Sequence, residues 1–351
     1  MNKIAQISLL LVLLMCNPER AIGQDKPAGI FAEQGELAME ITTDWQPLLR
    51  SRDNDTLYPG KLTLDLKSGG QLSIDVEVST RAKSRKKRDV CKFPPLKIYF
   101  DKKQMAGTTL HGIKSLKLVT HCSRSNRYDS YYVKEFLIYR AYNEITPLSF
   151  RVRSLRVTYT DSEGKRDTET DFAFFIEDVD DLAKRNGFEE LETDRIRPSK
   201  IDLRTHSLYS MFQYMIGNLD WSSFSAPNGS DCCHNSKLLA TGEKEPPFYP
   251  VAYDFDASGL VNAHYSLPPE DLKVRRVTDR LYRGFCYHNN FTAETLALFR
   301  EKKDSILALF KDEGRLKDKA KQKALDYLGK FFELIDDPKK VEREFERKCL
   351  G

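Results

Sequence analysis

The polar residues best placed for chemistry lie between Gly217 and Gly259. Asp220 follows directly after a predicted helix, and Asn235 precedes a short apolar strand. The turn that comes next leads into a second strand, which ends at Asp254. The two strands of such a hairpin are antiparallel, so we expect Asn235 and Asp254 at the same end of the ribbon. An amide oxygen beside a carboxylate suits a hard cation such as Mg²⁺.

The neighbours of these residues offer alternatives for the metal. Asp256 lies two residues beyond Asp254 and is a further candidate ligand. Asn228 lies between Asp220 and Asn235 and competes with Asn235 for the same role. We favour Asn235 because the strand follows it directly, and we expect His234 beside it to shape this loop.

The order of an acid, an asparagine, a hairpin and Asp-Phe is that of the protein-kinase catalytic core. There the first Asp accepts the hydroxyl proton, while the Asn and the second Asp hold Mg²⁺. That core also needs a strand Lys for the nucleotide phosphates and a Glu on the next helix to hold the Lys. Lys117 lies on a predicted strand, and Glu135 lies on the predicted helix that follows it.

In these segments the chain resembles the spore-coat protein H kinase-like family, a divergent branch of the kinase superfamily. The likeness covers residues 93–284. The segments that carry it are Phe93-Pro94-Pro95-Leu96, Leu116-Lys117-Leu118-Val119, Lys134-Glu135-Phe136-Leu137-Ile138-Tyr139-Arg140, Gly217-Asn218-Leu219-Asp220-Trp221, His234-Asn235 and Tyr253-Asp254-Phe255-Asp256-Ala257-Ser258-Gly259.

The resemblance implies an exported atypical kinase that transfers the γ-phosphoryl group of ATP to a Ser or Thr hydroxyl of a protein, with Mg²⁺ as cofactor. Lys117, positioned by Glu135, would bind the nucleotide phosphates. Asp220 would be the base, and the metal ligands would be Asn235, Asp254 and Asp256. The implied fold is α+β, a two-lobed protein-kinase-like domain with a β-rich N-terminal segment and a helical C-terminal tail.

This chain departs from the family before the Phe-Pro strand. The family tends to have an Arg-Gly step there, whereas this chain has a basic run over residues 81–88. The run would clamp phosphates or an acidic substrate, or it is a solvated loop.

Simpler interpretations stand beside the enzymatic one. Lys117 and Glu135 could be an ordinary ion pair, and Asp220 could cap a turn after its helix. Asp254 and Asp256 could bind Ca²⁺. Two further functions therefore remain open: a catalytically inactive kinase-like binding module of the cell envelope, and an exported structural protein that binds Ca²⁺.

The elements that would position these residues follow from hydrophobic periodicity. Leu62, Leu64 and Leu66 alternate, and a turn at residues 68–71 joins them to a second alternating run, which predicts a hairpin. The spacing of apolar residues predicts helices over residues 133–145 and 208–216. Four segments result: a signal peptide (1–23), a β-rich segment that begins the N-lobe (24–119), a kinase-like core (120–291) and C-terminal helices (292–351).

Residues 1–23 have the three-part pattern of a secretion signal, so we expect a periplasmic or extracellular protein. The apolar run at residues 7–15 is too short to span a bilayer, which takes about 20 residues. Cys16 lies inside that run rather than at its end, which disfavours a lipid anchor. The net charge of +4 implies no nucleic-acid partner.

Six cysteines remain after the signal, an even number that suits an oxidising compartment. Their connectivity cannot be deduced from the sequence. Cys232 and Cys233 could bridge separate partners, but free thiols are the simpler interpretation. No CxxC motif is matched by a second one, so a structural zinc site has little support.

Overall fold

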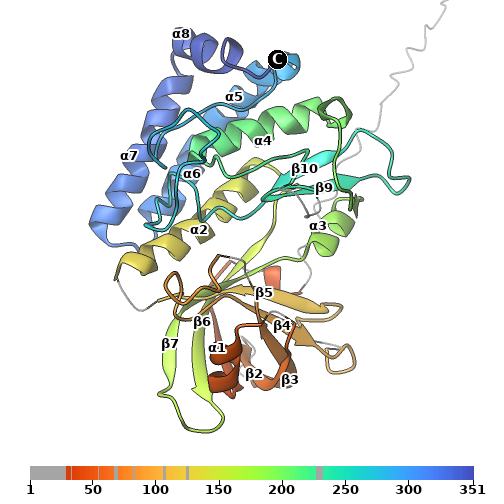
Figure 1. The fold of residues 1–351 in the computed structure, drawn as a ribbon, viewed down its shortest axis with the longest axis vertical. Coiled ribbons are helices and arrows are strands. Elements are labelled where there is room, and N and C mark those ends of the chain that lie inside the picture. The colour runs from red at the N-terminus through yellow and green to blue at the C-terminus, as the bar shows by residue number, and fades with distance from the viewer. Residues whose placement is uncertain are drawn as a thin grey trace, which may run out of the picture.

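The computed structural model describes residues 29–351 apart from 33, 54, 67–69, 82–83, 106–107, 124–125 and 227–231. The predicted signal peptide, with Cys16, lies outside the described residues. The described chain has two parts: a β-barrel below and a mainly helical part above, with the C-terminus at the far end of the helical part (Figure 1).

Seven strands form the barrel, in the order β1-β2-β3-β4-β5-β7-β6. Neighbouring strands are antiparallel except for β1 and β6, which run parallel and close the barrel. Alternate residues of each strand face inward, so the period-2 pattern of the sequence supplies the barrel core. The strands are β1 (Leu37–Thr43), β2 (Tyr58–Leu66), β3 (Gly70–Thr80), β4 (Leu96–Phe100), β5 (Ser115–Val119), β6 (Val152–Asp161) and β7 (Glu169–Ile176).

The predicted hairpin is the β2–β3 pair, in which Leu66 is paired with Gly70. Its turn falls at residues 67–69, outside the described residues. A short helix, α1 (Trp45–Ser51), follows β1, and Asp44 caps its N-terminus by accepting a hydrogen bond from the amide of Gln46.

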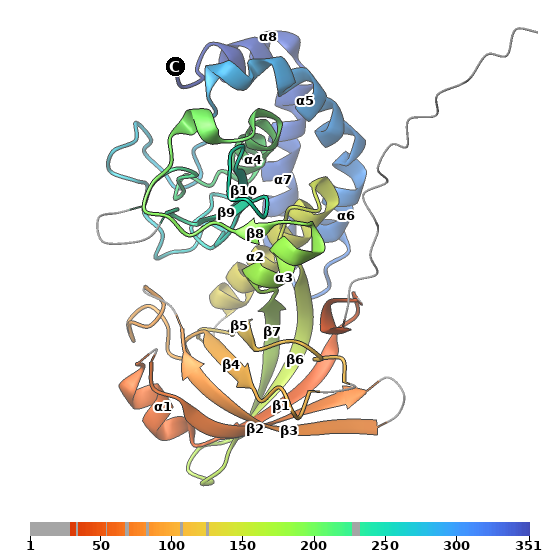
Figure 2. The ribbon, with the colours of Figure 1, turned by 90° about the vertical axis from the view of Figure 1, so that its right-hand side faces the viewer.

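Strands β6 and β7 join the two parts because both of their faces are buried. On β7, Ala173 and Phe175 belong to the barrel core, whereas Phe172 and Phe174 pack in the core of the helical part. Helix α2 (Asn126–Ile145) lies against the outer face of these strands, between the barrel and the other helices (Figure 2).

The predicted two-lobed protein-kinase-like fold is wrong, although the chain is α+β. The β-rich unit is a closed, mixed, seven-stranded barrel, and it takes its last two strands from beyond residue 119. Strands β6 and β7 lie close together in the sequence, but the parallel β1–β6 pairing joins segments more than a hundred residues apart. Local periodicity carries no signal for such pairing.

The helical part is built on α4 (Leu203–Ile216), which includes the predicted helix and buries its apolar side chains from Tyr209 to Ile216. Asp202 accepts a hydrogen bond from the amide of Thr205 at 2.8 Å, and Gly217 ends the helix with φ 64°. The other helices of this part are α3 (Val179–Arg185), α5 (Thr292–Glu301), α6 (Lys303–Lys311), α7 (Asp318–Ile335) and α8 (Pro338–Val341). Among the described residues, no helix combines the length and apolar character needed to cross a membrane.

A small antiparallel sheet has the order β10-β9-β8 and packs beside α4. Its strands are β8 (Glu189–Glu190), β9 (Ser236–Ala240) and β10 (Tyr249–Ala252). The β9–β10 pair is the hairpin predicted to carry the candidate site.

Three pairs of cysteines lie at disulfide distance. Cys91 pairs with Cys122, and Cys286 pairs with Cys349. Cys232 pairs with its neighbour Cys233 rather than remaining free. The pairs engage all six cysteines of the predicted mature chain.

Candidate functional site

Asp220 is held in place by the end of α4. After Gly217, the side chain of Asn218 is buried, and its Oδ1 accepts a hydrogen bond from the amide of Asp220 at 3.1 Å. The indole of Trp221 donates to the carbonyl oxygen of Asn218 at 2.9 Å. The backbone is thereby fixed on both sides of Asp220, while 45% of the Asp220 side chain stays exposed.

Two side chains orient the carboxylate of Asp220. Its Oδ1 lies 2.6 Å from Nε2 of His234, and its Oδ2 accepts a hydrogen bond from Nδ2 of Asn235 at 2.9 Å. The same Nδ2 also donates to the backbone oxygen of Asp220 at 2.7 Å. Asn235 has φ 47°, a left-handed conformation that Asn tolerates better than most residues. The carboxylate is therefore oriented and still accessible from solvent.

The β9–β10 hairpin brings Asn235 and Asp254 to one end, as its antiparallel geometry predicts. Ser236 pairs with Ala252, and just beyond this pair the amide of Tyr253 donates to the carbonyl oxygen of Asn235 at 3.2 Å. Asp254 follows with φ 59°, and its amide donates to the hydroxyl oxygen of Tyr139 on α2 at 3.1 Å. The two candidate metal ligands thus leave the same end of the ribbon.

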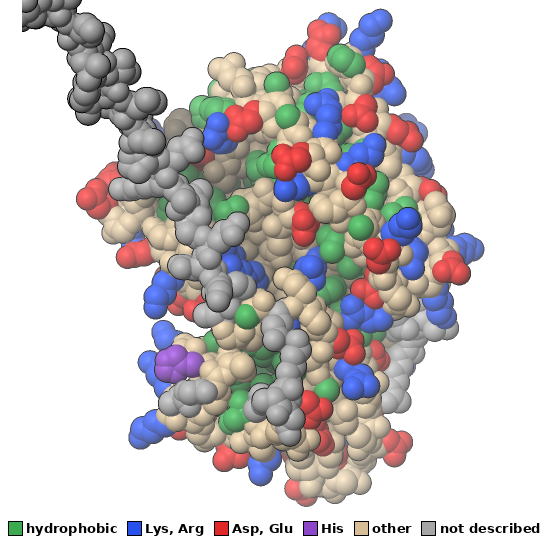
Figure 3. Space-filling view, turned by 180° about the vertical axis from the view of Figure 1, so that it is seen from behind, with side chains coloured by type: hydrophobic (Ala, Val, Ile, Leu, Met, Phe, Trp, Pro, Cys, Tyr) green, Lys and Arg blue, Asp and Glu red, His purple; other side chains and the backbone are tan. Residues whose placement is uncertain are grey.

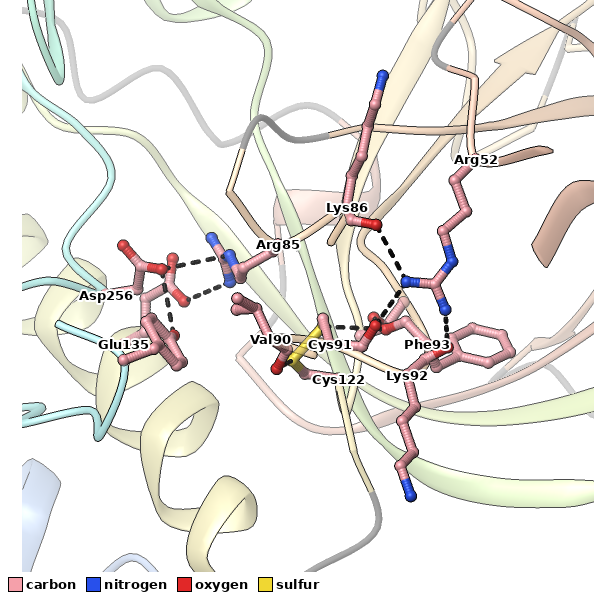
Figure 4. Close-up of a disulfide and its surroundings, with 12 residues drawn as sticks. Arg52, Arg85, Lys86, Val90, Cys91, Lys92, Phe93, Cys122, Glu135 and Asp256 are labelled. Carbon is pink, nitrogen blue, oxygen red and sulfur yellow. Dashed lines mark hydrogen bonds and ion pairs between the residues drawn. A yellow bond between two sulfur atoms is a disulfide. The ribbon is translucent and has the colours of Figure 1, made fainter. Parts of the chain in front are cut away.

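Arg85 is the centre of a buried acidic cluster, which comprises Glu135, Asp254 and Asp256. Its guanidinium nitrogens lie 3.2 Å from Glu135, 3.5 Å from Asp254 and 3.3 Å from Asp256. Figure 4 shows the Arg85 side chain pointing toward Glu135 and Asp256. The hydroxyl of Tyr265 also donates to Oδ2 of Asp256, at 3.2 Å. Exposure falls from 33% for the Asp254 side chain to 2% for Glu135.

Three carboxylates surround one guanidinium, so the cluster has surplus negative charge only when at least two of the carboxylates are ionised. Burial, together with the charge of Asp256, raises the pKa of Asp254 to about 8. Burial also raises the pKa of Glu135, although Arg85 opposes the shift. For Arg85, burial alone would lower the pKa, but the surrounding carboxylates outweigh burial and the net shift is upward.

Lys117 is not the partner of Glu135, which corrects the predicted pair. Among the described residues, the cation paired with Glu135 is Arg85. The ammonium of Lys117 instead lies 5.3 Å from the ring centroid of Tyr253. Arg81 reaches the same tyrosine, donating to its hydroxyl oxygen at 3.3 Å. Lys117 and Arg81 therefore meet at the residue that precedes Asp254.

The orphaned nitrogen of Arg81 tests whether an anion fits beside Tyr253. Nε of Arg81 is buried and has no hydrogen-bond partner within the described part of the chain. A buried donor without a partner costs about 1–3 kcal/mol. An acceptor oxygen from an anionic ligand would satisfy this donor and would also meet the charge of Lys117.

The oxygen atoms at the acidic cluster show whether a divalent cation fits there. Asn235 uses Nδ2 for Asp220, so Oδ1 remains as its ligand atom. Asp254 is the most exposed of the three acids, with 33% of its side chain accessible, and Asp256 lies beside it. These oxygen donors fit Mg²⁺ or Ca²⁺. The described residues contain no ready-made group of three or more acid, His or Cys ligands. Asn228 falls outside the described residues.

All of the predicted site residues belong to one run of contacts. It leads from Asp220 through Asn235 and Tyr253 to Asp254, and from there through Arg85 to Glu135 and Asp256, with Lys117 over Tyr253. Arg81 and Arg85 both belong to the basic run at residues 81–88, but the sequence singles out neither of them within that run. The density of positive charge in that run was the available signal.

Arg85 is fixed by a segment anchored to the barrel. The guanidinium of Arg52 donates to the carbonyl oxygens of Lys86, Cys91 and Lys92 at 3.0, 2.6 and 2.5 Å. The Cys91–Cys122 pair ties the same segment to the end of β5 (Figure 4).

Comparison with family models, with curated proteins and with solved structures gives no match.

Proposed function

We propose that this protein is an exported phosphotransferase that moves the γ-phosphoryl group of ATP to a Ser or Thr hydroxyl of a protein. One observation carries the proposal. An oriented, half-exposed carboxylate, Asp220, lies in the same run of contacts as the cluster of three acids at the end of the β9–β10 hairpin. The resemblance to the spore-coat protein H family over residues 93–284 supports the same activity.

Asp220 is proposed to orient the acceptor hydroxyl and take its proton as the new P–O bond forms. His234 and Asn235 hold both carboxylate oxygens, so the carboxylate need not reorganise when the acceptor arrives. The bond between the γ-phosphorus and the bridging oxygen breaks, and ADP leaves with that electron pair.

The anionic side of the substrate is proposed to lie beside Tyr253. Lys117 lies over this ring and Arg81 donates to its hydroxyl, so both cations would meet phosphate oxygens. Glu135 is not proposed to position Lys117, because its ion-pair partner is Arg85.

Asn235, Asp254 and Asp256 are proposed to hold Mg²⁺. A bound divalent cation would take the place of the proton on Asp254 and would neutralise charge on the phosphates. Arg85 already contacts Asp254 and Asp256 and limits their negative charge, which leaves Asp254, the more exposed acid, as the more available ligand.

The test is transfer of label from γ-labelled ATP to the protein itself or to a Ser-rich acceptor in the presence of Mg²⁺. Asp220→Asn should slow transfer by roughly 10²–10⁴-fold. Asp312→Asn, which removes an exposed acid in the helical part, should leave the rate unchanged. If purified wild-type protein neither transfers label nor is stabilised by Mg-ATP, the proposal is wrong.

A catalytically inactive binding module is the second candidate, and one observation favours it. Arg85 forms ion pairs with all three acids of the cluster, as a structural network would. Stabilisation by Mg-ATP without transfer would identify such a module, whereas stabilisation by Ca²⁺ alone would identify an exported Ca²⁺-binding structural protein.

Export is part of the proposal. The signal-like segment at residues 1–23 supports it, and three cysteine pairs at disulfide distance are consistent with an oxidising compartment. ATP is expected to be scarce there, so the enzyme would need a supplied nucleotide or would act before release. N-terminal sequencing of secreted protein should find Gln24 first.

A further inference from the structure

A cavity of about 440 Å³ lies beside α2, and its lining includes no residue of the acidic cluster. Residues from α2, from the turn at residues 261–262 and from the start of α7 surround it. We name it the basic cavity after its five positively charged lining residues, which are Lys134, Arg315, Lys317, Lys319 and Lys323. Among the side chains that the structure describes, no Asp or Glu lines the cavity.

The charged residues that line this cavity are all basic, unlike those of the surface in general. Seen from behind, acidic and basic side chains are interspersed over the helical part (Figure 3). Of the five cations in the basic cavity, Arg315 is neutralised, because it pairs with Glu313 at 2.7 Å and with Glu36 at 3.3 Å. Within the described part of the chain, the other four form no ion pair.

Lys134 makes the cavity a built site rather than a cluster of mobile surface lysines. It is 9% exposed, and its Nζ donates to the carbonyl oxygens of Leu260, at 3.0 Å, and Val261. These bonds fix the ammonium at the wall of the cavity. Burial, reinforced by the charge of Lys323, lowers the pKa of Lys134 to about 8, because no anion compensates its charge.

The N-terminus of α7 borders the basic cavity. Lys317 precedes this 18-residue helix, and no side chain caps its N-terminus. The amides of the first turn of a long helix, with the positive end of its dipole, attract anions. Lys319 in this turn and Lys323 one turn later both line the cavity.

We propose that the basic cavity binds a compact, multiply charged phosphate, such as the diphosphate group of a small molecule. Its volume falls within the range of small-ligand pockets. Four cations without ion-pair partners would outnumber the two to three negative charges on the ligand, so the cavity would stay positive by about one to two charges and favour an anion. Ser130 and Asn262 also line the cavity and add polar groups for hydrogen bonds.

This site is distinct from the proposed active site. Lys134 and Glu135 are neighbours on α2, but Lys134 contacts the carbonyls of Leu260 and Val261 whereas Glu135 contacts Arg85. The segment from Asp254 to Val261 therefore runs from the acidic cluster to the wall of the basic cavity.

Pyrophosphate, titrated calorimetrically at a constant ionic strength set with NaCl, tests the proposal. Wild-type protein should bind it, and Lys319→Gln/Lys323→Gln should weaken binding at least tenfold. Lys61→Gln/Lys339→Gln removes the same charge from exposed positions elsewhere and should change the dissociation constant less than twofold. Absence of binding by wild-type protein, or equal losses in the two double variants, would overturn the proposal.

A second comparison separates this site from the ATP site. Arg81→Gln/Lys117→Gln should keep pyrophosphate binding if the ligand occupies the basic cavity. Loss of binding in that variant, with retention in Lys319→Gln/Lys323→Gln, would place pyrophosphate beside Tyr253 and refute the basic cavity as its site. The proposed phosphotransferase could then still be correct.

Discussion

Arg85 is the residue on which the candidate site depends most. Its side chain is 7% exposed and is the only cation within ion-pair distance of the acidic cluster in the described part of the chain. Breaking a buried ion pair by removing one partner is costly, because the other charge is left buried and uncompensated. Arg85 therefore controls both the stability of the site and its affinity for other cations.

Arg85→Gln should lower the free energy of unfolding by about 3–5 kcal/mol, measured by urea denaturation. Arg88→Gln, in the same segment but exposed, should change it by less than about 0.5 kcal/mol. Equal effects from the two substitutions would show that the cluster does not need the Arg85 charge.

The raised pKa of Asp254 predicts how the protein responds to pH. An unfolded Asp loses its proton near pH 4, whereas folded Asp254 keeps it up to about pH 8. The folded state therefore binds more protons between these values, so Asp254 makes stability fall as pH rises from about 4 to 8. Asp254→Asn should flatten this decline in thermal unfolding measured across the same pH range. A decline of unchanged slope would refute the assignment.

Mg²⁺ competes with that same proton. Affinity for Mg²⁺ should therefore increase from pH 6 to pH 8 and level off above, when titrated calorimetrically. Affinity that is constant over this range would show that Asp254 is not a ligand.

At the scale of elements, the segment that carries Arg85 depends on Arg52. A single guanidinium holds carbonyl oxygens of Leu49, Lys86, Cys91 and Lys92, and each would lose a donor without it. The segment's position then rests on the Cys91–Cys122 pair and its remaining backbone bonds.

Arg52→Ala should speed hydrogen exchange of the amides of residues 84–93 at least tenfold. It should also weaken any binding of Mg²⁺, because Arg85 is no longer held against the acids. Arg50→Ala on the same helix, whose side chain is exposed, is the control and should leave exchange unchanged. Unchanged exchange in Arg52→Ala would mean that other contacts position the segment.

The sequence predicts local elements well and long-range partners poorly. Helix α4 and the β9–β10 hairpin could be predicted because apolar periodicity, Gly217 and the turn all lie within short windows. The partner of Glu135 could not be predicted in this way. Arg85 lies 50 residues earlier in the sequence and comes into contact with Glu135 only once the barrel has folded. Lys117 occupies the place of the strand lysine in the kinase order, but it lies over Tyr253 and does not pair with Glu135.

For the whole molecule, β6 and β7 decide the architecture. They close the barrel on one face and support α2 on the other, so α2 holds Glu135 and Tyr139 at the junction of the two parts. The two-lobed expectation was wrong because closure depends on the β1–β6 pairing, which no local pattern reveals. The loop with Asp220 and the loop with Asp254 nevertheless belong to the helical part, where α4 and the β9–β10 hairpin were predicted from local patterns.

The Cys286–Cys349 pair should stabilise the helical part. It closes a chain segment of 63 residues, and a loop of this length is worth roughly 4 kcal/mol when cross-linked. Cys286→Ser/Cys349→Ser should therefore lower the free energy of unfolding by about 2–4 kcal/mol in urea denaturation. No change, with free thiols detected in the wild-type protein, would show that the bond does not form.

The central claim is that the acidic cluster and the cations beside Tyr253 form one metal–nucleotide site. Its most direct test is calorimetric titration of ATP with and without Mg²⁺ in wild-type protein and in Asp254→Asn. We predict at least tenfold tighter binding of ATP by wild-type protein when Mg²⁺ is present, loss of that difference in Asp254→Asn, and its retention in Lys319→Gln/Lys323→Gln. An affinity for ATP that is absent, or that Mg²⁺ and Asp254→Asn leave unchanged, would contradict the claim.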